Sequence, residues 1–258
     1  MNKPIFFCDL DDTLFQTRRK MKAHEKIENQ PVAALDRSLQ PRSFFNPQQQ
    51  MFVQWLLENS HLVPVTARGT SEIARVQIPF QSWQVTTHGA VILQADGSVQ
   101  EVWKQQMMKA LQPYKERIIA LQRFFTQAFK QANVAAWARI NYEYDHTPIY
   151  LVAKHTNSLH VDKLYQIVEG LQDQIDLSGF YVHQNDNNIA WLPTCVQKGK
   201  AVSFVIQQLT DEYGIRPIIG LGDSLSDMSF LKLCHWFGMP NKGQLATRVM
   251  GSMVETER

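Results

Sequence analysis

This 258-residue chain is poor in three features that would each define a protein class: long apolar stretches, net charge and paired cysteines. No stretch approaches the roughly 18 consecutive apolar residues that a membrane-spanning helix needs. The formal net charge of +2 is too small to indicate nucleic acid or an anionic membrane as a partner. The three cysteines, Cys8, Cys195 and Cys234, form no C-x-x-C pair, so neither a disulfide framework nor a zinc site is predicted. Residues 1–4 lead into a predicted strand without a signal-peptide apolar region, and we therefore expect a cytoplasmic protein.

The remaining composition is that of a soluble globular protein, with 44% hydrophobic and 19% charged residues. Short apolar runs typical of buried strands alternate with helical patterns at both ends of the chain. The predicted strands are 5–8, 61–65, 83–86, 90–93, 217–221 and 236–239, and the predicted helices begin at Pro47, Thr70, Gly199 and after Asp227. This alternation predicts an α/β fold with a doubly wound parallel sheet.

Residues 104–193 follow a different plan, helix-strand-strand twice over, with Pro113 expected to kink or restart the first helix. Such a segment predicts an inserted α+β domain whose helices lie on one face of a sheet. The expected organisation is therefore a first core part over 1–103, an insert over 104–193 and a second core part over 194–258.

Residues 16–46 are polar, mixed in charge and interrupted by Pro31 and Pro41. Irregular connections of this length in compact domains are typically functional flaps or disordered segments. The sequence alone leaves open whether this stretch is ordered.

Two carboxylates, Asp9 and Asp11, directly follow the apolar run 5–8. Open α/β sheets bind their ligands at the carboxyl ends of the strands, where these side chains are expected. An aspartate there can attack phosphorus and carry an aspartyl-phosphate, and a second carboxylate can transfer the proton. The alternative is an Asp-rich turn with no chemistry, because Asp is a favoured turn residue.

Other strand ends and helix starts carry complementary groups: Thr66 with Ala67 and Arg68, then Lys198, then Asp223 with Asp227. Phosphoryl transfer requires positioning and charge neutralisation, which a hydroxyl and a cation supply. Mg²⁺ prefers oxygen ligands and is usually held by one or two carboxylates with phosphate and water. Asp9 and Asp223 are the expected ligands, with the backbone carbonyl of Asp11 as a third.

Four segments resemble, in order, the four motifs of the haloacid dehalogenase-like phosphohydrolases: Asp9–Thr13, Thr66, Lys198 and Gly222–Asp227. The insert resembles the cap of the subclass that contains Cof-type sugar phosphatases, and sucrose-phosphate phosphatases are similar. Thr87–Ala90 also resembles a segment of that subclass. The resemblance implies a Rossmann-like core with an inserted cap.

The resemblance also implies residue roles. Asp9 is the expected nucleophile and Asp11 the general acid/base. The expected phosphate-binding or substrate-binding residues are Thr66, Ala67, Arg68, Lys198 and Ser226, and the expected metal site comprises Asp9, Asp11, Asp223 and Asp227. Ser226 and His88 stand where the family often has Asn, which leaves the phosphate contact of Ser226 open.

Each of these side chains also has a purely structural explanation. Thr66 could cap a helix, and Asp227 could interact with a helix dipole. Arg68 could form a surface ion pair, and Lys200 competes with Lys198 for the phosphate role.

The predicted function is a Mg²⁺-dependent phosphatase that hydrolyses a small phosphorylated metabolite, a sugar or glycosyl phosphate by subclass resemblance. We expect a monomer or weak dimer with a small-molecule partner, and no nucleic-acid or membrane partner. The alternatives are a phosphomutase or phosphotransferase with the same site, and a non-catalytic regulatory module that retains the fold.

Overall fold

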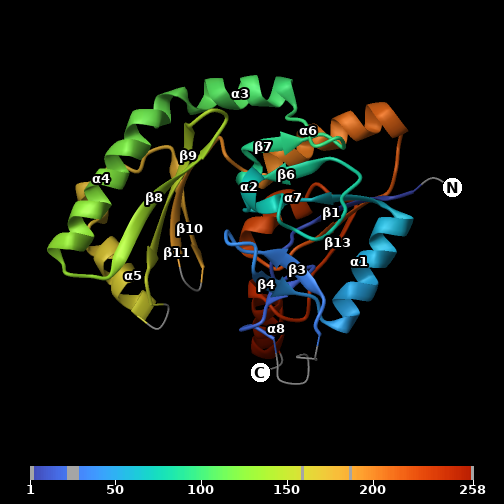
Figure 1. Ribbon diagram of the computed structural model, residues 1–258, viewed down its shortest axis with the longest axis horizontal. Helices are drawn as coiled ribbons and strands as arrows, with labels where there is room; N and C mark the ends of the chain where they lie inside the picture. The colour runs from blue at the N-terminus through green and yellow to red at the C-terminus, as the bar shows by residue number, and fades with distance from the viewer. Residues whose placement is uncertain (1–2, 22–28, 158–159, 186–187, 257–258) are drawn as a thin grey trace. The chain divides into compact units, whose positions relative to one another are not determined.

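The computed structural model describes residues 3–21, 29–157, 160–185 and 188–256. The chain divides into two compact units, and Figure 1 shows their elements. The core unit comprises Met1–Glu101 and Gln197–Arg258, and the cap unit comprises Val102–Val196. The boundaries expected from the sequence were after residues 103 and 193. Within the described part of the chain, every helix is too short or too polar to cross a membrane.

A four-stranded parallel sheet lies at the centre of the core unit, in the order β13-β12-β1-β5. Its strands are β1 (Ile5–Cys8), β5 (His61–Pro64), β12 (Ile218–Leu221) and β13 (Trp236–Gly238). All four residues of β1 are buried because neighbours cover both faces of this central strand, as its unbroken apolar run predicted. In register, Cys8 lies between Leu221 of β12 and Pro64 of β5, so the three strands end together.

Helices lie on both sides of this sheet, with α1 and α6 on opposite sides of β1 (Figure 1). The core helices are α1 (Pro47–Asn59), α2 (Thr70–Ile73), α6 (Lys198–Tyr213), α7 (Met228–Leu231) and α8 (Gln244–Thr256). Asn46 and Gln49 form a capping box at the start of α1, and Pro47 occupies its first position. The predicted doubly wound α/β fold is confirmed. The sequence analysis did not predict α8.

The sequence left open whether the segment between β1 and α1 is ordered, and its described residues form regular structure. Three short strands form an antiparallel sheet in the order β2-β4-β3. They are β2 (Gln16–Thr17), β3 (Val32–Leu35) and β4 (Pro41–Phe44), while residues 22–28 lie outside the described residues. Leu35 donates its N–H to the carbonyl of Arg75, and Gln77 donates to the carbonyl of Ala33. These two bonds attach β3 to a segment about 40 residues further along the chain, a contact that local sequence patterns do not signal.

A hairpin of β6 (Gln84–Thr86) and β7 (Val91–Leu93) extends the core next to β5. The two predicted strands are confirmed, and the 3-10 segment η2 (Thr87–Gly89) joins them. Residues 95–98 then reverse the chain between Leu93 and Val99, which form a separate antiparallel bridge.

The cap unit has the predicted doubled helix-strand-strand plan. Its helices are α3 (Glu101–Leu111), η3 (Gln112–Tyr114), α4 (Lys115–Gln131), α5 (Val161–Gly170) and η5 (Gln172–Gln174). Its strands are β8 (Ala136–Glu143), β9 (Thr147–His155), β10 (Phe180–Asn185) and β11 (Asn188–Pro193), which form an antiparallel sheet in the order β10-β11-β9-β8. As predicted, the helical stretch breaks and restarts around Pro113, which lies in η3.

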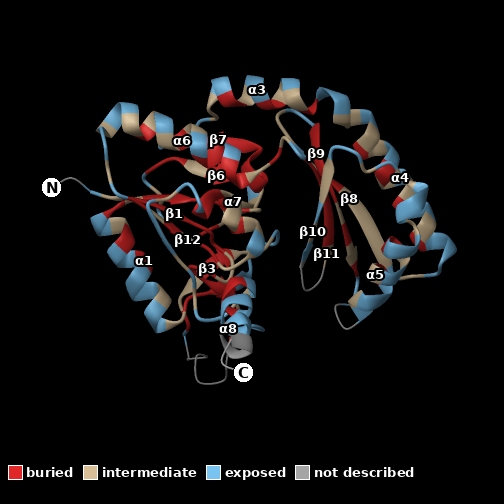
Figure 2. Cartoon of the chain, turned by 180° about the vertical axis from the view of Figure 1, so that it is seen from behind, coloured by how far each residue is buried: buried red, intermediate tan, exposed pale blue. Residues whose placement is uncertain are grey.

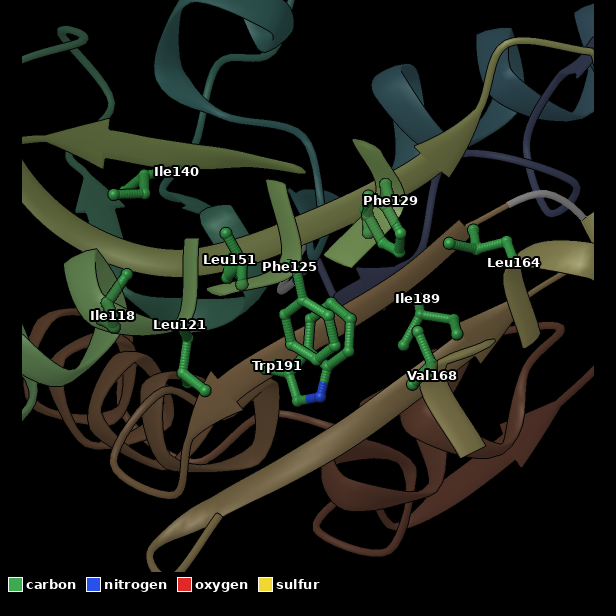
Figure 3. Close-up of a cluster of buried hydrophobic side chains, with 11 residues drawn as sticks. Ile118, Leu121, Phe125, Phe129, Ile140, Leu151, Leu164, Val168, Ile189 and Trp191 are labelled. Carbon is green, nitrogen blue, oxygen red and sulfur yellow. The ribbon is translucent and has the colours of Figure 1, made fainter. Parts of the chain in front are cut away.

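An aromatic cluster forms the centre of the cap unit (Figure 3). Phe125 of α4 stacks on Trp191 of β11 with ring centroids 4.2 Å apart. The ring centroid of Phe129, on the same helix, lies 5.9 Å from that of Phe125. Leu164 and Val168 of α5 contribute to the same cluster. Figure 2 shows buried residues on the sheet-facing side of α4 and exposed residues on its other side. The cap unit therefore has a hydrophobic core of its own.

Candidate active site

Asp9 is the first residue after β1, at the carboxyl edge of the parallel sheet. Its N–H donates to the carbonyl of Leu221 at 2.9 Å, which continues the pairing between β1 and β12 for one residue. The chain then turns, since Leu14 donates its N–H to the carbonyl of Leu10 at 2.9 Å. Asp12 occupies the left-handed region in this turn, with a φ of 67°. The tight turn leaves Asp9 buried at the sheet edge.

Two further carboxylates meet Asp9 at this edge. Asp223 follows the end of β12, and Asp227 closes the 3-10 segment η6 (Leu225–Asp227). Carboxylate oxygens of Asp9, Asp223 and Asp227 lie within 4.8 Å of one another. A Cβ on Gly222 would lie 2.6 Å from the Cβ of Asp227, so this close approach needs glycine at position 222. Residues from opposite ends of the chain therefore share one site, which we call the carboxylate cluster.

Lys198, the first residue of α6, supplies the cation of this cluster. Its Nζ donates to Oδ1 of Asp9 and to Oδ1 of Asp227, each at 2.7 Å, and the side chain is 5% exposed. The other oxygen of Asp227 accepts hydrogen bonds from the N–H of Ser224 at 2.9 Å and from its Oγ at 2.7 Å. A Cβ on Gly199 would lie 2.3 Å from the carbonyl of Ser229, so glycine permits α6 to begin this close to α7. Lys200, the competing residue, is exposed.

Burial and mutual repulsion control the charges in the cluster. Burial raises the pKa of Asp9 well above its usual value, Lys198 opposes the shift, and Asp227 and Asp223 reinforce it. Burial and the charge of Asp227 raise the pKa of Asp223 to about 7. The pKa of Lys198 also lies above its usual value, because Asp227 and Asp9 outweigh the effect of its burial. Neighbouring carboxylates thus contribute to all three shifts, after burial for the two aspartates.

A divalent cation would compensate the charge of the ionised cluster. When all three carboxylates are ionised, the one ammonium group leaves two negative charges without compensation, which one Mg²⁺ ion would neutralise. The available donors are all oxygen atoms, the ligand type that Mg²⁺ prefers. Asp9, Asp223 and Asp227 are therefore the side chains that could hold the ion.

The side chains of Asp11 and Arg68 pair with each other. The Nε of Arg68 donates to Oδ2 of Asp11 at 2.7 Å, and its Nη2 donates to Oδ1 at 2.8 Å. The Asp11 side chain is thus not a member of the carboxylate cluster, which leaves only its backbone carbonyl as a predicted metal ligand. The Arg68 side chain is committed to this carboxylate, as the ion-pair alternative anticipated.

Thr66, Ala67 and Ser226 occupy the expected loops. Thr66 is buried beyond β5, where its N–H donates to the carbonyl of Val85 at 2.9 Å and its Oγ1 accepts the N–H of Arg68 at 3.1 Å. Ala67, between Thr66 and Arg68 in the chain, is half-buried. The hydroxyl of Ser226 is hydrogen bonded to that of Ser224 at 2.8 Å. The phosphate-binding roles of these three residues stay predictions.

Two segments with motif resemblance support the site in ways that their sequence did not assign to them. Ser224 holds Asp227, and its signal was the Ser-x-x-Asp spacing of a capping box. Thr87, His88 and Gly89 in η2 all have φ between 52° and 93°, a strained run. His88 and Thr87 donate their N–H groups to the carbonyls of Thr66 and Arg68, so η2 supports the Thr66 loop. No sequence signal predicted this conformation at Thr87 and His88, because it is rare for residues other than glycine.

Comparisons with known proteins agree with the architecture. The chain matches no known protein-family profile and no curated protein. The C-terminal domain of trehalose-6-phosphate phosphatase from C. albicans is similar over 90% of this chain and 73% of its own, with a TM-score of 0.54 and 15% identity. A protein from Thermoplasma acidophilum is similar over 96% of this chain and 89% of its own, with a TM-score of 0.52 and 10% identity. At these identities the similarity establishes the fold alone. The chain therefore shares its α/β fold with these two proteins.

Proposed function

We propose that this protein is a Mg²⁺-dependent phosphatase that hydrolyses a small phosphorylated metabolite through an aspartyl-phosphate on Asp9. The observation that carries the proposal is the carboxylate cluster, in which Asp9, Asp223 and Asp227 converge around Lys198 at the carboxyl edge of the sheet. A buried excess of negative charge is costly unless a cation compensates it, and it commonly marks a functional site.

The proposed chemistry has two steps, and in each of them Asp11 transfers one proton. An oxygen of Asp9 attacks phosphorus while Asp11 gives a proton to the leaving oxygen. Asp11 then takes a proton from the water that attacks the aspartyl-phosphate, which releases inorganic phosphate, frees the carboxylate of Asp9 and returns Asp11 to its protonated form. A bound Mg²⁺ ion would supply charge neutralisation for the phosphoryl group. Lys198, with Thr66 and Ser226, would bind the phosphoryl oxygens.

A sugar or glycosyl phosphate is the proposed substrate class. Support comes from the subclass resemblance of the motifs and cap plan, and one protein that shares the fold is a trehalose-6-phosphate phosphatase by name. A fold can host many substrates, and a panel of phosphorylated metabolites distinguishes among them. We further propose that the protein acts in the cytoplasm as a monomer or weak dimer, with a small molecule as its partner.

Hydrolysis of p-nitrophenyl phosphate by the purified protein, with and without Mg²⁺, tests the reaction. We expect turnover that requires Mg²⁺, disappears in Asp9→Asn and persists in Asp96→Asn, a matched change at an exposed turn. Absence of Mg²⁺-dependent turnover for p-nitrophenyl phosphate and for a panel of phosphorylated metabolites would instead support a regulatory module. The same panel identifies the substrate class.

A phosphomutase would return the phosphoryl group to its substrate rather than to water. Reaction in ¹⁸O-labelled water separates the two outcomes. Hydrolysis incorporates the label into released phosphate in proportion to turnover. An isomeric phosphorylated product without labelled phosphate would contradict the proposal.

A further inference from the structure

The Arg68–Asp11 pair differs from an ordinary surface ion pair in how unequally its partners are buried. The Asp11 side chain is 44% exposed, whereas the Arg68 side chain is only 14% exposed. Both oxygens of Asp11 accept hydrogen bonds, from Nε and from Nη2 of Arg68. Such a two-point contact fixes the plane of the carboxylate as well as its position.

The surroundings hold the Arg68 guanidinium in place. It lies over the ring of Phe15, with its central carbon 5.2 Å from the ring centroid. Phe15 is fully buried and is itself tied to the acidic turn, because Asp12 donates its N–H to the Phe15 carbonyl at 2.7 Å. At the backbone, the N–H of Arg68 donates to Oγ1 of Thr66. Arg68 thus connects the Thr66 loop to the Asp11 turn.

An isolated carboxylate as exposed as Asp11 would exchange between rotamers, because solvent can hydrogen bond it in each of them. Proton transfer to a leaving group requires the carboxylate oxygen within hydrogen-bond reach of one particular atom. The burial of Arg68 supplies the rigidity that the exposed side chain of Asp11 does not have.

We propose that Arg68 is the positioning residue of Asp11, and that it acts through this carboxylate rather than by binding the phosphoryl group. The inference rests on the proposed function, since it assigns Asp11 the proton-transfer role. It replaces the phosphate-binding role that the sequence predicted for Arg68.

Steady-state kinetics with p-nitrophenyl phosphate and inhibition by inorganic phosphate test this assignment in Arg68→Ala and Arg68→Lys. Since a misplacement of about 1 Å can cost about a hundredfold in rate, we expect kcat of Arg68→Ala to fall by about tenfold to a hundredfold. KM and the inhibition constant for phosphate should change by less than about threefold, because binding is not affected. Arg68→Lys should recover part of kcat, since lysine keeps the charge but lacks the planar fork.

The decisive measurement is a double-mutant cycle with Asp11→Asn. If Arg68 acts only through Asp11, Arg68→Ala should cost less than about twofold in that background. The matched control is Arg75→Ala, because Arg75 donates to the carbonyl of Ser71 rather than to a carboxylate. Thermal unfolding curves verify that each variant is folded.

Three results would overturn the inference. A rise of about tenfold or more in KM and in the phosphate inhibition constant at unchanged kcat would make Arg68 a phosphate ligand. An equal loss of kcat for Arg68→Ala in the wild-type and Asp11→Asn backgrounds would show that Arg68 acts independently of Asp11. A wild-type protein without Mg²⁺-dependent turnover would overturn the proposed function and this role together, whereas the first two results leave the phosphatase activity intact.

Discussion

Removal of the Lys198 ammonium group should strongly destabilise the metal-free protein. In Lys198→Met, the buried carboxylates of Asp9 and Asp227 each lose a charged partner at 2.7 Å. Removal of one partner from a buried ion pair typically costs about 3–5 kcal/mol, because the remaining charge has no compensation. We expect a loss of about this size at pH 8, a large fraction of the 5–15 kcal/mol by which a typical domain is stable.

Two further measurements depend on the same reasoning. The loss of unfolding free energy in Lys198→Met should become smaller toward pH 5. Protonation of Asp9 removes its uncompensated charge, and burial already raises the pKa of this carboxyl group. Saturating Mg²⁺ should also reduce it, since the ion would replace part of the missing positive charge.

Urea unfolding of wild type and variant at both pH values, with and without Mg²⁺, provides the test. Lys200→Met is the matched control on the same helix, and because Lys200 is exposed its effect should stay within about 0.5 kcal/mol. A loss below about 1 kcal/mol at pH 8, or one that does not depend on pH, would refute the idea that Lys198 neutralises the cluster.

Three other consequences can be measured independently. The pKa of Asp223, raised to about 7, lies above its value in the unfolded chain, so the stability of the metal-free protein should fall as pH rises from about 4 through 7. Mg²⁺ affinity, measured by calorimetry, should rise over the same range because the ion displaces the proton, and a flat profile would contradict the assignment. Gly222→Ala should weaken Mg²⁺ binding, since the added Cβ would lie 2.6 Å from the Cβ of Asp227. In the control Gly170→Ala the added Cβ meets open space, so binding should not change, and equal Mg²⁺ affinities in the two variants would contradict the prediction. In the cap unit, Phe125→Ala should cost about 3–5 kcal/mol in urea unfolding by opening a cavity, and a cost below about 1 kcal/mol would mean that the aromatic cluster is not tightly packed.

The elements that were predicted correctly have signals that are local in sequence. β1 is an unbroken apolar run, α1 begins with a capping box and Pro47, and the restart between α3 and α4 lies at Pro113. The elements that were missed have no such signal. β3 is short and pairs in part with the backbone near Arg75, and α8 carries no acidic residue in its first turn.

The candidate site shows the same division. The position of Asp9 and Asp11 at a strand end could be read from a few consecutive residues. The partner of each charged group could not, because Arg68 and Asp11 are 57 residues apart and Lys198 and Asp9 are 189 residues apart. Ser224 is an intermediate case. Its capping-box spacing is visible in the sequence, but its role in the site depends on where Asp227 lies in the fold.

The sequence by itself thus determined the alternation of the main-sheet strands with α1, α2, α6 and α7, the doubled plan of the cap and the chemical types of the site residues, because periodicity, caps and motif spacing are properties of neighbouring residues. Only the tertiary structure decided which carboxylates converge, which lysine neutralises them and that Arg68 holds Asp11. Those choices depend on where the parallel strands end relative to one another, and on close approaches such as that of Gly222 to Asp227, which packing alone sets.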